Sequence, residues 1–471
     1  MTLASSLAYE PFGPLSGLTY GNGLVLSKTF TEDYQPETIV VQDTSTSTVV
    51  VNRSYTIGDS INITGIADSL TSARSEAYTY TASNRLQEGD GIWGTLVWTY
   101  DGVGNRTSEA LTSGSTTTNT YNYPSTSNLL SSLTQSSTTV RSFSYDGAGN
   151  VTADTRGSTT YNYAYNKRNR LAELTIGSTV TADYTYDGLE RLAIRTTSNM
   201  TPAGTTQYVY DLDGYLIAEA GGSGNTLTEY VWVDDMPLTV VANVDTSPTL
   251  YFVHADHLNR PIRMTDISES VVWDAVYNPF GDVNSITGTA SNNMRFPGQY
   301  FLIEDGLHYN WHRQYDPTIG RYTQPDPLGF VNGPSVYSYA MSRPTIETDP
   351  NGLFVAPFPP VIPLLRLYPP LPFPYLGPQN PDNPFVGPQD KDPCAGLRKQ
   401  LADHEQKLKD YMDDPQRYDN KGILGKGNDQ SVIEGRIRNL QRQIENFRKL
   451  LKECEDEHGR PNFTQCGPGP A

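Results

Sequence analysis

Pairs of aromatic residues, each followed by a turn, recur along the first half of the chain. The motif is Tyr-x-Tyr (Trp or Phe at some first positions), then Asp or a substitute, a short turn and an apolar residue. It occurs at 78–86, 98–106, 143–151, 163–171, 184–192 and 208–216. Because side chains alternate along a strand, both rings lie on one face. Asp-Gly and Gly-Asn tolerate the positive φ of a tight turn, so each motif predicts a β-hairpin.

The spacing of the motifs predicts how the hairpins are arranged. The second ring of each pair falls at positions 80, 100, 145, 165, 186 and 210, so one interval has double length and predicts a degenerate repeat near Tyr123. One motif is typical of any hairpin, whereas six at a regular interval indicate stacked units. A hairpin cannot bury its own apolar face. The pattern therefore predicts a mostly β protein, with stacked hairpins in one large, curved antiparallel sheet.

The pattern changes after residue 354. Residues 355–393 contain 13 prolines, a density that favours extended polyproline II structure. This stretch is either a semi-rigid linker or an apolar strap packed against the β-sheet.

Two runs with apolar residues spaced by three and four follow, from Cys394 to Tyr411 and from Ile433 to Cys454. This spacing predicts an antiparallel helical hairpin, or two amphipathic helices packed on another surface. In the hairpin Cys394 and Cys454 are neighbours, and we expect a disulfide between them only after export.

Charge and composition exclude several classes of function. The net charge is −18, with −19 in residues 1–390 and +1 in residues 391–471. The acidic body argues against nucleic acid or an anionic membrane as a general partner. Without a visible signal peptide or an 18-residue apolar run, we expect no stable membrane span. Export would then use a route without a signal peptide, from a cytoplasmic precursor.

Several longer strings resemble the RHS (rearrangement hotspot) family of YD-repeat proteins. They are YEPFGPLSGLTYGNGL near the start, FVHADHLNRPIRMTD at 252–266, VYNPFGD at 276–282, LHYNWHRQYDPTIGRYTQPDPLGF at 307–330 and VYSYAMSRPTIETDPNGL at 336–353. The resemblance implies a β-shell that encloses a C-terminal toxin. It divides the chain into a partial YD-repeat shell (1–250), an RHS-associated core (251–353), the proline-rich linker (354–393) and an effector-like helical tail (394–471).

Asp326 and Asp349 each open an Asp-Pro-x-Gly sequence, which by chemistry alone is a turn. The family resemblance implies more: a single-turnover aspartyl autoprotease with Asp326 and Asp349 as its carboxyl pair and Arg321 as the supporting cation. The implied cleavage lies between Leu353 and Phe354. Two adjacent carboxyls share one proton, so one can activate water while the other polarises the carbonyl.

Other candidate chemistry is weak. His254 and His257, and His308 and His312, have spacings that suit a metal only on a helix, yet they lie in strand-like sequence. We therefore expect neither a metal nor a cofactor. The tail shows no enzymatic motif.

Two functions fit these observations. The first is a polymorphic-toxin-type RHS protein of bacterial competition, secreted or at the cell surface, that cleaves itself and releases 354–471. Its expected partners are an immunity protein for the tail and a secretion apparatus. The alternative is a non-catalytic structural or adhesive cell-surface protein whose helical tail mediates assembly.

Overall fold

The computed structural model describes residues 2–357 apart from positions 12 and 59, residues 395–414, and individual positions between 433 and 452. The chain divides into two compact units, Met1–Pro369 and Pro370–Ala471. The stretch 358–394 lies outside the described residues, as do Cys394, Cys454 and Cys466. The linker and the disulfide therefore remain predictions.

One antiparallel sheet of 26 strands forms the first unit, which confirms the mostly β prediction. Each strand pairs with the strand before it and the strand after it in the chain, as stacked hairpins require. The sheet continues past residue 250 as far as Gly288. Its strands are β1 (Ala4–Tyr9), β2 (Leu15–Tyr20), β3 (Val25–Phe30), β4 (Pro36–Gln42), β5 (Val49–Ile57), β6 (Ile63–Asp68), β7 (Glu76–Tyr80), β8 (Leu86–Gly91), β9 (Gly94–Tyr100), β10 (Arg106–Ser113), β11 (Ser115–Asn122), β12 (Ser132–Gln135), β13 (Thr138–Tyr145), β14 (Val151–Arg156), β15 (Thr159–Tyr165), β16 (Leu171–Ile176), β17 (Thr179–Tyr186), β18 (Leu192–Thr197), β19 (Gly204–Tyr210), β20 (Leu216–Gly221), β21 (Thr226–Val233), β22 (Met236–Ala242), β23 (Thr249–Ala255), β24 (Pro261–Thr265), β25 (Val271–Tyr277) and β26 (Val283–Gly288).

The second ring of each pair ties its hairpin to the preceding one. Tyr165 Oη donates to the carbonyl oxygen of Val151 at 2.8 Å, and Tyr186 Oη donates to that of Leu171 at 2.8 Å. Tyr123 makes the same bond, to the Arg106 carbonyl at 3.0 Å, which confirms the degenerate repeat predicted near it. The hydroxyls thus form a ladder along the inner face, each satisfying a carbonyl at the start of a neighbouring strand.

The aspartate that follows the second ring holds the turn together. Asp146 Oδ1 accepts hydrogen bonds from the amides of Ala148 and Asn150, both at 2.9 Å. Asn166 makes the equivalent bonds with its own side-chain oxygen. A short acceptor at this position therefore closes a five-residue turn, which is why Asn can replace Asp.

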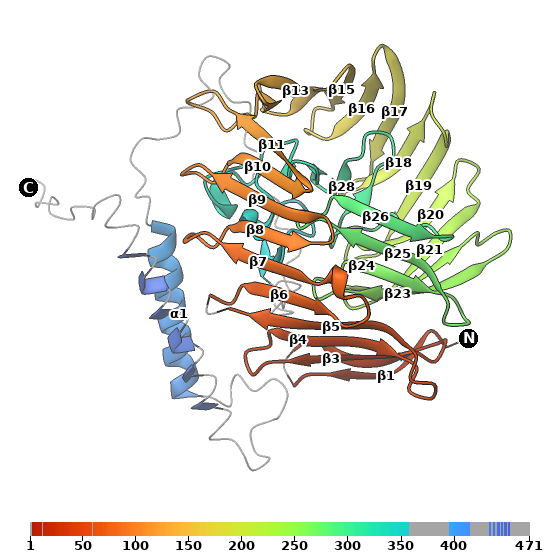
Figure 1. The fold of residues 1–471 in the computed structure, drawn as a ribbon, viewed down its shortest axis with the longest axis vertical. Helices are drawn as coiled ribbons and strands as arrows, with labels where there is room; N and C mark the ends of the chain where they lie inside the picture. The colour runs from red at the N-terminus through yellow and green to blue at the C-terminus, as the bar shows by residue number, and fades with distance from the viewer. Residues whose placement is uncertain are drawn as a thin grey trace, which may run out of the picture. The chain divides into compact units, whose positions relative to one another are not determined.

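The sheet bends until its two ends face each other. Figure 1 shows the green strands β23–β26 beside the red and orange strands at the start of the sheet. Tyr20 Oη donates to the Val253 carbonyl at 3.1 Å, and Arg74 pairs with Asp274 at 2.7 Å. Apolar side chains from both ends, such as Leu26 and Phe252, share one core. Residues far apart in sequence thus stabilise the curve.

Residues after β26 lie inside this curve. Leu302 and Leu307 pack with Tyr163 and Leu174 from the inner face of the sheet. This inner segment holds six short strands, β27 (Tyr300–Phe301), β28 (His308–Asn310), β29 (Arg313–Asp316), β30 (Arg321–Tyr322), β31 (Glu347–Thr348) and β32 (Ala356–Pro357), and the short 3-10 turns η2 (Phe330–Asn332) and η3 (Ala340–Ser342). A third such turn, η1 (Ser72–Arg74), precedes β7.

The second unit is helical where it is described. Helix α1 spans Ala395–Asp413, and the described positions between 433 and 452 are also helical. Arg448 Nη2 bonds Glu405 Oε1 at 2.7 Å, which links the two helical segments. Among the described residues, no helix is both long and apolar enough to cross a membrane.

Candidate active site

Strands β29 and β30 place two side chains at the centre of the candidate site. Tyr315 lies opposite Tyr322 in their antiparallel register, and Arg313 is two residues before Tyr315. Because side chains alternate along a strand, Arg313, Tyr315 and Tyr322 share one face. The Arg313 guanidinium lies 3.6 Å from the centre of the Tyr322 ring.

Arg313 brings the two predicted aspartates together. Its Nη2 atom lies 3.2 Å from Asp326 Oδ2 and 2.9 Å from Asp349 Oδ2. The two carboxyl oxygens are therefore separated by no more than the sum of these distances. All three residues are buried, and Asp349 is 0% exposed. A buried cation between two buried carboxyls holds the two groups close together and compensates their charge.

Asp326 and Asp349 each close their own turn and also form the carboxyl pair, because each side chain uses a different oxygen for the two tasks. Asp326 Oδ1 accepts from the Leu328 amide at 2.8 Å, as an Asp-Pro-x-Gly turn requires. Asp349 Oδ1 likewise accepts from its own loop, while both Oδ2 atoms face Arg313. Gly352 has φ +69°, and a Cβ there would lie 2.4 Å from the Asn310 carbonyl oxygen, so only glycine fits this turn.

The Leu353–Phe354 peptide bond lies within this loop. The Phe354 amide donates to Asp349 Oδ1 at 3.0 Å, and the Leu353 amide donates to the same oxygen at 2.9 Å. On the other side, Asn332 Nδ2 donates to the Leu353 carbonyl oxygen at 2.8 Å. Both ends of this peptide bond are therefore held by side chains of the site.

The two carboxyls have different environments. Burial raises the pKa of Asp326, although Arg313 opposes the rise. Asp349 instead accepts from four donors: Arg313, the Tyr322 hydroxyl at 2.8 Å, and the Leu353 and Phe354 amides. Asp326 is thus the carboxyl of the pair for which burial favours the protonated form.

No family model matches the chain. The chain is 39% identical over 104 residues to the Toxin protein Tse5 of Pseudomonas aeruginosa, covering 22% of this chain and 8% of that protein. It is 45% identical over 64 residues to the Probable deoxyribonuclease RhsA of Dickeya dadantii, covering 14% of this chain and 4% of that protein. Its fold matches the crystal structure of TcdB2-TccC3 with a TM-score of 0.63 and 19% identity, over 74% of this chain and 20% of that chain. The two curated relatives support the resemblance to RHS proteins, and the solved structure supports the fold. The chain thus spans a small part of each of these proteins.

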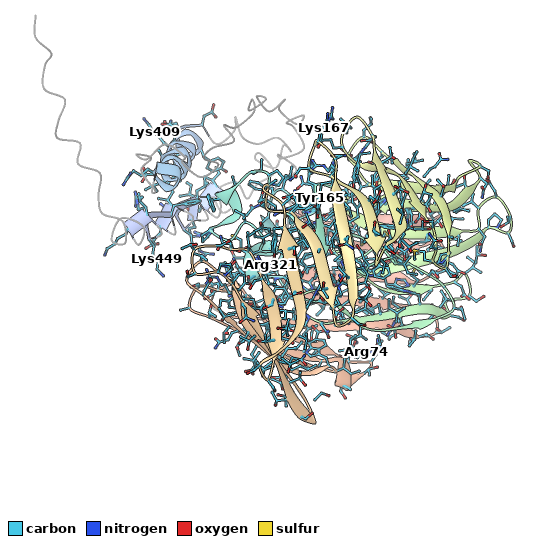
Figure 2. All side chains as sticks on the ribbon, turned by 90° about the horizontal axis from the view of Figure 1, so that it is seen from above. Arg74, Tyr165, Lys167, Arg321, Lys409 and Lys449 are labelled. Atoms are coloured by element: carbon cyan, nitrogen blue, oxygen red, sulfur yellow. The ribbon has the colours of Figure 1, made fainter. Side chains whose placement is uncertain are left out.

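The structure places Arg321 away from the aspartate pair. Its guanidinium donates to the Tyr123 hydroxyl and to the Asn128 carbonyl, both at 2.7 Å. Arg321 precedes Tyr322 on β30, so strand alternation turns it to the opposite face, towards the repeats (Figure 2). The arginine that contacts both aspartates is Arg313, and not Arg321 as expected.

The sequence analysis did not predict three residues that contact the aspartate pair: Arg313, Tyr322 and Asn332. Arg313 and Tyr322 could have been proposed from strand alternation once the β29–β30 hairpin register was known. Asn332 is the last residue of the short 3-10 turn η2, and nothing in the local pattern indicates its contacts.

The histidines have structural partners. His254 Nε2 bonds the Thr265 hydroxyl at 2.9 Å, and His308 Nδ1 bonds Gln299 Oε1 at 2.8 Å. In the part of the chain that the structure describes, no group of three or more His, Cys, Asp or Glu side chains could hold a metal ion.

Proposed function

We propose that this chain is part of an RHS-type toxin and that it cleaves its own Leu353–Phe354 bond, releasing residues 354–471. One observation carries the proposal: the Leu353–Phe354 peptide is hydrogen-bonded inside a loop lined by two buried carboxyls that meet on one arginine. A purely structural turn has no need of a second carboxyl on the same guanidinium.

The reaction follows from the positions of the groups. Asp349 removes a proton from water, and the water oxygen adds to the Leu353 carbonyl carbon, whose oxygen gains the negative charge. The C–N bond then breaks, and its electron pair remains on the Phe354 nitrogen. That nitrogen takes the proton from Asp349, whose Oδ1 is already 3.0 Å away. The products are a Leu353 carboxylic acid, which keeps the second proton of the water, and a Phe354 amine. The pair regains its starting protonation, and the new acid then gives its proton to the amine.

Arg313 and Asp326 support this step. Arg313 holds Asp349 in place and compensates its buried negative charge. A protonated Asp326 keeps further negative charge away from the forming oxyanion. Both tasks require burial, which excludes bulk water from the site.

The names of the relatives support the toxin part of the proposal, since Tse5 is called a toxin and RhsA a probable deoxyribonuclease. In this proposal, residues 354–471 are the effector, and an immunity protein and a secretion apparatus are the partners. The non-catalytic, adhesive alternative explains the stacked hairpins equally well, yet it gives no reason for the buried pair beside one peptide bond.

The test compares three variants of the full chain. Asp326→Asn and Asp349→Asn remove one carboxyl each and should leave the chain whole, while the wild type is cut. Asp266→Asn is the matched control, because Asp266 Oδ1 also closes a turn, by accepting from the amides of Ser268 and Ser270. If both site variants are cut as completely as the control, the aspartates are not the protease.

A further inference from the structure

An amide side chain stands between Asp326 and the peptide bond proposed for cleavage. Asn332 Nδ2 donates to the Leu353 carbonyl oxygen at 2.8 Å and to Asp326 Oδ2 at 2.9 Å. Asn332 Oδ1 accepts from the Val355 amide at 3.3 Å. The two neighbours of Nδ2 are acceptors and the neighbour of Oδ1 is a donor. These contacts identify which atom of the Asn332 amide is the nitrogen and which is the oxygen.

We infer that Asn332 is a catalytic residue that stabilises the oxyanion formed on the Leu353 carbonyl oxygen. The inference rests on the proposed self-cleavage and assigns a residue to it. When water adds to the carbonyl carbon, the π electrons of the C=O bond move to the oxygen, and the Asn332 N–H already points at that atom. The amide keeps its proton throughout, so the negative charge stays on oxygen until the C–N bond breaks.

This geometry alters the role expected of the aspartate pair. In the simplest scheme for two carboxyls, the protonated partner polarises the carbonyl directly. Here Asp326 accepts from the same Asn332 nitrogen that donates to the carbonyl, so its described link to the carbonyl oxygen runs through the amide. Asp326 thereby orients the donor and raises the polarity of its N–H bonds.

Apolar packing contributes little to the turn that carries Asn332. In the 3-10 turn Phe330–Asn332, Phe330 is 71% exposed and Val331 is 59% exposed. These apolar side chains therefore add little packing energy to the turn. Its tie to the site is the set of three Asn332 hydrogen bonds, to Asp326, Leu353 and Val355.

The experiment measures the rate at which the full chain, newly made by cell-free translation, converts into its fragments. Asn332→Ala should cleave about 10²–10³-fold more slowly than wild type, the usual loss for one oxyanion donor. Val331→Ala is the matched control, an exposed neighbour in the same turn, and should cleave at the wild-type rate.

Asn332→Asp separates catalysis from folding. The aspartate side chain has the same shape as asparagine, but in its ionised form it cannot donate a hydrogen bond to the Leu353 carbonyl oxygen. Cleavage of this variant at neutral pH should therefore be slow. Lowering the pH protonates the new carboxyl and restores a donor, so its rate should recover relative to wild type. A purely structural role would give no such recovery.

The outcomes are distinct. If Asn332→Ala cleaves as fast as wild type, or if Asn332→Asp stays equally slow at every pH, the inference is wrong. In both cases the proposed function survives provided that Asp326→Asn and Asp349→Asn still block cleavage. A folded wild-type chain that never cleaves would instead overturn the proposed function itself.

Discussion

At the scale of single residues, the site depends on which face of the β29–β30 hairpin each arginine side chain occupies. Arg313 bonds both aspartates, whereas Arg321 bonds Tyr123 and Asn128 on the other face of the hairpin. Both arginines are buried, so charge and burial alone do not distinguish them. Only the contacts assign one to the site and the other to the packing of the repeats.

This difference predicts opposite results for two matched substitutions. Arg313→Ala leaves two buried carboxyls without their shared cation, so cleavage should fall by at least about 100-fold. Arg321→Ala removes two hydrogen bonds to the repeats and should lower the free energy of unfolding by about 1–3 kcal/mol while the chain still cleaves. Gel time courses and urea unfolding measure the two effects. Normal cleavage in Arg313→Ala would remove that arginine from the account.

The raised pKa of Asp326 predicts the direction of the pH dependence. The pair is active while Asp326 holds a proton, and burial extends that state to a higher pH than an ordinary aspartate allows. The cleavage rate should therefore fall as pH rises through the Asp326 pKa. Rates measured between about pH 4 and about pH 8 test this, and a rate that rises steadily with pH would contradict it.

The local chemistry of Asp-Pro-x-Gly predicted only the two turns, and the RHS resemblance implied that their aspartates form a pair. The Leu353–Phe354 position was likewise implied by the resemblance. In the structure this peptide bond contacts Asp349 directly and Asp326 through Asn332. Arg313 and Asn332 could not be predicted in this way. Their contacts depend on strand register and on a loop that returns from another part of the core.

At the scale of the element, each hairpin combines a hydroxyl ladder with a side-chain cap on its turn. The rings of one pair nevertheless differ, as β15 shows. Tyr165 Oη bonds the Val151 carbonyl, whereas the buried Tyr163 Oη has no hydrogen-bond partner among the described residues. Tyr165 is labelled in Figure 2 on this strand. The first ring of this pair contributes apolar packing, and the second also contributes a hydrogen bond.

Two Tyr→Phe substitutions in this one strand test that distinction. Tyr165→Phe leaves the Val151 carbonyl without its donor and should lower the free energy of unfolding by about 1–2 kcal/mol. Tyr163→Phe removes only an unpaired hydroxyl and should be neutral or slightly stabilising. Urea unfolding of both variants decides the matter, and equal losses would show that the ladder bond does not matter.

The hairpins were predictable because their signals are local: a period of two along the strand and a short acceptor in the turn. The bend of the sheet was not predictable from those signals. It depends on pairs such as Arg74 with Asp274, which lie 200 residues apart in the chain.

At the scale of the whole molecule, the proposal separates a carrier from a cargo. The described shell holds the aspartate site against its inner face, while the effector would be residues 354–471. Expression of 354–471 alone in bacteria should then arrest growth, whereas expression of 1–353 should not. Equal growth of both cultures would contradict an effector that acts inside bacteria, and would favour an assembly role for the tail.

The central claim is cleavage at one peptide bond, and the most direct test is the intact mass and N-terminal sequence of the purified 471-residue chain. Self-cleavage should give two fragments, 1–353 and 354–471, with the new N-terminus reading Phe-Val-Ala-Pro from Phe354. The Asp349→Asn chain, purified in parallel, should keep the full mass of 52.0 kDa. A folded wild-type chain of full mass, or a new N-terminus at any other residue, would contradict the account.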